Sequence, residues 1–179
     1  MKLDPSYQYI AFTKGTGLIS RLMDWFQKGD WSHVLLLNWN LTWEAWEVMD
    51  TTSGGVRVCA WEAFKKSNHV VKVFKCDHDL VPTMRNYYGL VGDPKDEYDY
   101  WSILGFVWIK LMWWWFAVKI RNPLNNPKAW VCSGFVHRVF NQSKLPGYNE
   151  PLEYEIIDPD ALYEFMVKSD VFKEVILLW

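Results

Sequence analysis

Cysteine is scarce in this chain of 179 residues, which contains only Cys59, Cys76 and Cys132. The three are widely spaced and form no C-x-x-C pair, which argues against both a disulfide framework and a zinc site. We therefore expect no metal, no other cofactor and a reducing compartment. The N-terminal MKLDPSYQYI places Asp4 and Pro5 where a secretory signal needs an apolar run, so a cytoplasmic location is expected, with association with a virion as the alternative.

An excess of charge of one sign is missing as well. Nineteen Lys and Arg residues stand against 21 Asp and Glu residues, and no basic run stands out, so nucleic acid is not expected as a partner. Internal repeats, low-complexity tracts and linkers are also missing. The length therefore favours one domain over residues 1–179.

Aromatic residues are abundant, with 13 Trp, 9 Tyr and 10 Phe, which is more than a core of this size needs. The apolar segment 103–120 is expected to be a buried helix, because Lys110 near its middle disfavours a membrane span. At ~100° per residue, Trp113, Trp114 and Trp115 fan over about 200° of that helix. We expect at least one of them to face a membrane interface, a protein partner or a substrate tail.

The hydrophobic patterns predict an α+β domain in which an antiparallel sheet packs against helices. Strands are expected at residues 7–13, 33–39, 42–49, 56–61, 69–76, 154–157 and 171–179. Helices are expected at residues 18–29, 61–66, within 79–92, within 100–120, after Cys132 and after Pro159.

The stretch AWVCSGFVHRVF (129–140) places Cys132 at the start of a helix with one apolar stripe. A cysteine there is either a small core residue or a nucleophile, because the N-terminal end of a helix stabilises a thiolate. A nucleophile needs an imidazole to exchange its proton. His137 is turned about 140° away on the same helix, whereas His33 opens an apolar strand. On the residues alone, the core interpretation is favoured.

Larger motifs change this balance. W-S-H-V-L-L-L, a W-E strand followed by G-G-V-R-V, E-Y-D-Y-W, W-V-C-S-G-F-V and I-D-P-D-A-L follow one another in that order. This series resembles the circularly permuted branch of the NlpC-type papain-like superfamily, which includes YiiX-like hydrolases and lecithin retinol acyltransferase-like enzymes. The resemblance implies a papain-like fold with Cys132 as nucleophile, His33 as base and a polar residue on the next strand to orient His33.

Two glutamates compete for that orienting role. Glu44 and Glu47 lie on opposite faces of the predicted strand 42–49. A three-residue turn at 39–41 would pair His33 with Glu47, so we predict Glu47, with Glu44 as the alternative. Many relatives carry an acidic residue after Cys-Ser, and Gly134 occupies that position here. Its absence either favours the thiolate slightly or marks an altered activity.

The function expected from the resemblance is that of a bacterial or phage thiol hydrolase, a peptidase or amidase that forms an acyl-cysteine on cell-wall peptides. One alternative is a lipid-directed acyltransferase or esterase on the same Cys-His site, for which the aromatic helix is the sequence signal. The other is a catalytically silent structural module, such as a virion component. Thiol reactivity separates this last alternative from the first two.

Overall fold

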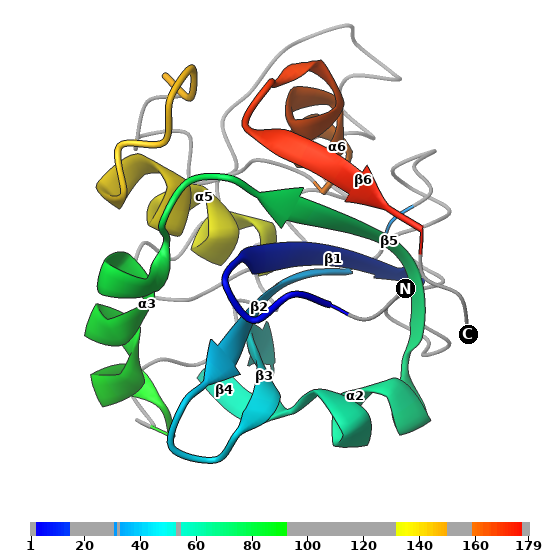
Figure 1. Cartoon of the computed structure of the whole chain (residues 1–179), viewed down its shortest axis with the longest axis vertical. Coiled ribbons are helices and arrows are strands. Elements are labelled where there is room, and N and C mark those ends of the chain that lie inside the picture. The colour runs from blue at the N-terminus through cyan, green and yellow to red at the C-terminus, as the bar shows by residue number, and fades with distance from the viewer. Residues whose placement is uncertain are drawn as a thin grey trace, which may run out of the picture.

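The computed structural model describes residues 3–14, 31, 33–52, 55–92, 132–149 and 159–176. Within them lies a six-stranded antiparallel sheet of order β4-β3-β2-β1-β5-β6, flanked by helices (Figure 1). The predicted α+β class is therefore confirmed. The strands are β1 (Gln8–Lys14), β2 (His33–Asn40), β3 (Ala45–Thr52), β4 (Gly55–Ala60), β5 (His69–Cys76) and β6 (Phe172–Val175).

The central strands are buried on both faces. In β2, Val34 and Leu36 belong to one hydrophobic cluster, whereas Leu35 and Leu37 belong to a second cluster on the other face. This is the period of two that a strand imposes, and it explains why the sequence reads as an unbroken apolar run. The sheet therefore needs a cover on each side.

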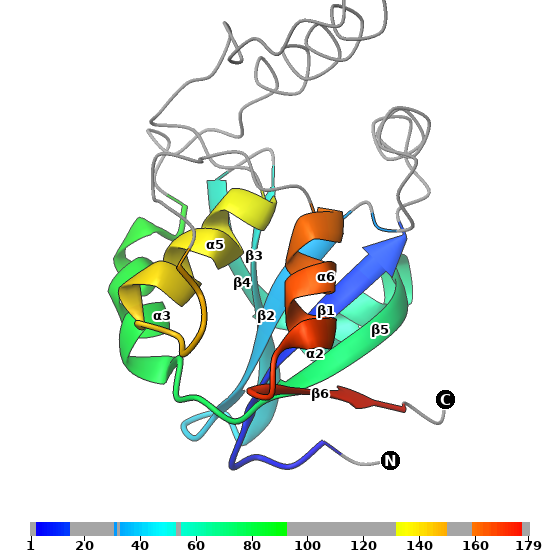
Figure 2. The same ribbon diagram turned by 90° about the horizontal axis from the view of Figure 1, so that it is seen from above.

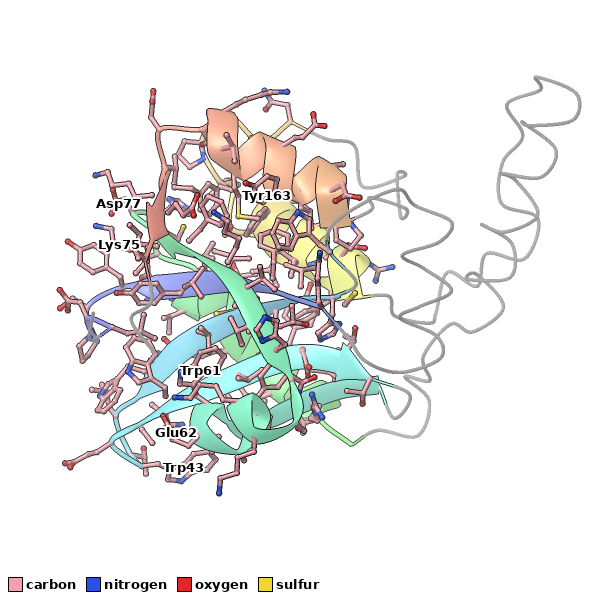
Figure 3. The ribbon with its side chains drawn as sticks, turned by 90° about the vertical axis from the view of Figure 1, so that its right-hand side faces the viewer. Trp43, Trp61, Glu62, Lys75, Asp77 and Tyr163 are labelled. Carbon is pink, nitrogen blue, oxygen red and sulfur yellow. The ribbon has the colours of Figure 1, made fainter. Side chains whose placement is uncertain are left out.

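Helices supply these covers, with α5 and α6 on one face of the sheet and α2 on the other (Figures 1 and 2). Figure 3 shows Tyr163 of α6 on the opposite side of the sheet from Trp61 of α2. The Tyr163 ring lies 5.6 Å from that of Phe12 and 5.0 Å from that of Trp31, which fixes α6 to the sheet. The helices are α2 (Trp61–Ser67), α3 (Val81–Tyr87), the 3-10 helix η1 (Tyr88–Leu90), α5 (Cys132–Gln142) and α6 (Pro159–Lys168).

The β2–β3 hairpin differs from the prediction. Asn38 pairs with Glu47 and Asn40 with Ala45, so the loop has four residues, 41–44, instead of three at 39–41. The cause is local: Asn40 Oδ1 accepts the backbone N–H groups of residues 42 and 43 at 2.9 and 3.1 Å, which makes an Asx-type turn after Asn40. Glu44 then closes the loop with a left-handed φ of 47°. The predicted pairing of His33 with Glu47 is wrong.

One exposed aromatic residue stands in this loop: the Trp43 side chain is 64% exposed. The predicted helices at 18–29 and 100–120, with Trp113, Trp114 and Trp115, lie outside the described residues, as does the predicted strand at 154–157. In the part of the chain that is described, no helix has both the length and the apolar character to span a membrane.

Candidate active site

His33 is the first residue of β2, so its imidazole lies at an end of the sheet, where groups from both faces can meet. Its Nε2 atom lies 3.0 Å from Oδ2 of Asp50 on β3. The register explains this contact: Leu37 pairs with Val48, and alternation places both His33 and Asp50 on the face of that pair. Asp50 is fully buried, whereas the side chain of His33 keeps 21% of its surface exposed.

Cys132 reaches His33 from the other face of the sheet. It is the first residue of α5, which packs on β2 and β3, and its side chain is fully buried. The thiol is hydrogen-bonded to the His33 side chain and accepts the backbone N–H groups of Val34 and Ser133. The structure thus brings together the two residues that the sequence singled out.

The two side chains stabilise each other's charged forms. Burial alone raises the pKa of the Cys132 thiol, but the positive charge of His33 and the hydrogen bonds to the sulfur outweigh burial and lower it. Burial alone lowers the pKa of His33, but the charge of Cys132 and the hydrogen bonds to Asp50 and Cys132 raise it to about 10. Both shifts favour a thiolate facing an imidazolium over a neutral thiol facing a neutral imidazole.

Asp50 completes the series and is held in turn by Arg57 on β4. Arg57 Nε donates to Asp50 Oδ1 at 2.9 Å, and Nη2 donates to Oδ2 at 2.6 Å. Burial alone raises the pKa of Asp50, but the hydrogen bonds from His33 and Arg57 keep it below the ordinary value. The buried carboxyl therefore stays ionised.

This arrangement can perform nucleophilic chemistry. Because Nε2 of His33 donates to Asp50, Nδ1 is left to exchange a proton with the sulfur of Cys132. The backbone N–H groups of Val34 and Ser133 provide fixed dipoles beside the sulfur, where an oxyanion would form. A thiol, an imidazole and a carboxylate thus lie in the order that nucleophilic catalysis uses.

Glu47, predicted to orient His33, lies elsewhere, and this assignment is corrected. Its 1% exposed side chain accepts hydrogen bonds from Asn38 Nδ2 at 3.3 Å, from Asn40 Nδ2 at 2.8 Å and from the Tyr88 hydroxyl. The alternative, Glu44, is in the hairpin loop, at the opposite end of β2 from His33. Glu47 therefore ties η1 to the sheet and does not contact the imidazole.

We predict that Tyr88→Phe lowers the free energy of unfolding by about 1–3 kcal/mol, because a buried carboxylate loses one of its donors. Urea denaturation followed by tryptophan fluorescence measures the loss. The pH dependence of Cys132 alkylation should stay as in the wild type. A change in that dependence with no loss of stability would contradict a structural role for the Glu47–Tyr88 contact.

Hairpin parity does not point to Asp50 in the sequence, because the predicted strand 42–49 ends one residue before it and the predicted turn pairs His33 with Glu47. The pairing of β3 with β4 carries a signal, because Asp50 pairs directly with Arg57. An acidic residue in an apolar strand opposite an arginine is typical of a buried ion pair. That signal could have pointed to Asp50.

The other candidate side chains have different surroundings. His137 is buried, with Nδ1 2.5 Å from the Tyr148 hydroxyl, and Asn141 lies beside its ring. Burial raises the pKa of Cys59, and it raises the pKa of Cys76 to about 11. Gly134 is buried in the first turn of α5. Among the described residues, no group of three or more His, Cys, Asp or Glu side chains is arranged to hold a metal ion.

Comparison with known proteins adds no assignment: neither the protein-family models nor the curated proteins contain a match to this chain.

Proposed function

We propose that the protein is a thiol hydrolase that cleaves an amide or ester bond through an acyl-cysteine intermediate. The observation that carries the proposal is the hydrogen-bonded series Cys132–His33–Asp50, in which the pKa of the thiol is lowered at the start of a helix. The motif resemblance to permuted NlpC-type papain-like enzymes supports it. In that family too, a strand histidine precedes the helical cysteine.

The proposed reaction has two steps. The Cys132 thiolate attacks the carbonyl carbon, and the His33 imidazolium protonates the leaving amine or alcohol as its bond to that carbon breaks. The neutral imidazole then takes a proton from water, whose oxygen attacks the acyl-cysteine, and returns that proton to the departing sulfur. Asp50 remains ionised throughout and steadies each imidazolium.

The substrate class proposed is a peptide amide, with cell-wall peptides as the class that the resemblance suggests, in a single permuted papain-like domain. The three cysteines are free, which fits a reducing compartment, and we propose the cytoplasm. The lipid-directed alternative rests on Trp113, Trp114 and Trp115, so it stays a prediction from the sequence. No observation in the described residues favours it over peptide hydrolysis.

An acyl-trapping experiment tests the proposal. We expect p-nitrophenyl acetate to acetylate Cys132 within the first turnover, with the adduct found by acid quenching and peptide mass spectrometry. Cys132→Ala should abolish this adduct and leave the fold intact, because the change removes only the sulfur atom from a buried position. Acetylation shared equally with Cys59, or no acyl-cysteine at all, would overturn the proposal. Phospholipid vesicles offered as acyl donors then test the lipid alternative.

A further inference from the structure

Arg57 is placed to control the site without touching Cys132. It stands directly opposite Asp50 in the β3–β4 pair and binds both oxygens of that carboxylate. Oδ2 is shared between Arg57 and His33, whereas Oδ1 is bound by Arg57. Two parallel N–H donors on a planar fork fix the rotation of a carboxylate in a way that one point charge cannot.

A second contact holds the guanidinium itself. Arg57 Cζ lies 5.8 Å from the centre of the Phe64 ring, and Phe64 of α2 is 3% exposed. A cation over an aromatic face is attracted by the ring, and the buried ring does not move away. Arg57 is therefore positioned by the fold in the absence of substrate, although 42% of its side chain remains exposed.

The charges around the site alternate. The thiolate of Cys132, the imidazolium of His33, the carboxylate of Asp50 and the guanidinium of Arg57 follow one another, and Cys59 is a further titratable group that interacts with Asp50 and Arg57. Without Arg57, the imidazolium of His33 would face the negative charges of both Cys132 and Asp50, which leaves only partial charge compensation for the buried Asp50. Asp50 would then either protonate or leave the site with one excess negative charge, and both outcomes disfavour the thiolate.

We propose that Arg57 is the positioning residue of the Cys132 site, which fixes Asp50 so that Oδ2 accepts Nε2–H of His33 and Nδ1 is left to face the sulfur. This inference rests on the proposed function, and it adds a residue that the reaction itself never touches.

The test compares Arg57→Met, Arg57→Lys and a control, Lys66→Met, which removes an exposed cation from α2. Iodoacetamide alkylation of Cys132 is followed by peptide mass spectrometry across the acid range, and ¹⁵N shifts report the His33 ring. The pH at which the alkylation rate falls to half its maximum on the acid side is called the acid limb. We expect this pH to rise by about one unit in Arg57→Met. In Arg57→Lys the pH midpoint of alkylation should move less, and a titration followed by the ¹⁵N shifts should show the His33 ring losing its second proton at a lower pH than in the wild type. Lys66→Met should match the wild type.

The outcomes separate this inference from the proposed function. The first outcome is an acid limb that lies well below the ordinary thiol range in the wild type and does not change, together with the ring shifts, in either Arg57 variant. This outcome would overturn the role of Arg57 but not the proposed function. A wild type that alkylates Cys132 like an ordinary thiol would overturn both. Arg57→Lys keeps the charge, so it carries the test if Arg57→Met fails to fold, and wild-type behaviour there would overturn the bidentate positioning.

Discussion

The alkylation rate of Cys132 is expected to level off at a lower pH than that of an ordinary thiol, whereas the rates at Cys59 and Cys76 rise about tenfold per pH unit from pH 6 upward. Alkylation follows the thiolate fraction, and an ordinary thiol titrates near pH 8.5. The pKa of Cys132 is lowered, whereas the pKa of Cys59 and Cys76 is raised. Iodoacetamide labelling with peptide mass spectrometry gives the three profiles in one sample.

The shape of the profile is the useful observable, because Cys132 is buried and Cys59 is half-buried. Access to reagent scales a rate at every pH, but it leaves the midpoint unchanged. At pH 6 we expect Cys132 to react about 10- to 100-fold faster than Cys59, since a thiolate of low pKa is also a weaker nucleophile. Three parallel profiles would mean that Cys132 is only a core residue.

Histidine variants assign the partner of the thiol. His33→Ala should move the Cys132 midpoint upward, because the imidazolium and its hydrogen bond to the sulfur are lost. His137→Gln should leave the midpoint in place, since His137 is bonded to Tyr148 and Asn141. The reverse ranking would assign His137 rather than His33 as the partner of the thiol. The His33 pKa of about 10 places loss of the imidazolium far above neutral pH.

The sequence predicted most of the described elements, because their signals are local. The run of apolar residues in β2, the apolar stripe of α5 and the proline that opens α6 each report the burial of the segment that carries them. The approach of Cys132 to His33 is a contact between distant segments, which periodicity does not report. The order of the motifs, rather than periodicity, pointed to this pair of residues.

The residue that contacts His33 could not be predicted from local signals, because hairpin register depends on the length of the loop. The side chain of Asn40 and the left-handed backbone of Glu44 set a loop of four residues, and neither leaves a periodic signal. The predicted partner of Glu47 was His33, whereas its observed partner across the hairpin is Asn38. An error of one residue in the predicted loop length therefore changes which residue of β3 is predicted to lie opposite His33.

Asp50→Asn is expected to lower turnover of an activated ester by about 10²- to 10⁴-fold, with the upper end set by the corresponding change in a serine protease triad. The variant keeps the size of the side chain but loses the charge that stabilises the imidazolium of His33. Its amide N–H₂ can also donate to Nε2, which would put the ring proton on Nδ1, facing the sulfur. The measurements are kcat, the alkylation profile of Cys132 and the ¹⁵N shifts of the His33 ring.

The matched control is Glu47→Gln, an equally small change at a second buried carboxylate on the same strand, β3. Because Glu47 bonds to Asn38, Asn40 and Tyr88, we expect this variant to lose stability while its turnover and its Cys132 alkylation profile stay close to those of the wild type. Both variants remove one buried negative charge, so the contrast between them separates the loss of a buried charge from the loss of the Asp50 contacts with His33 and Arg57. If Glu47→Gln proves the more damaging to turnover, the orienting role returns to Glu47 and Asp50 becomes a structural partner of Arg57, while Cys132 and His33 keep their places.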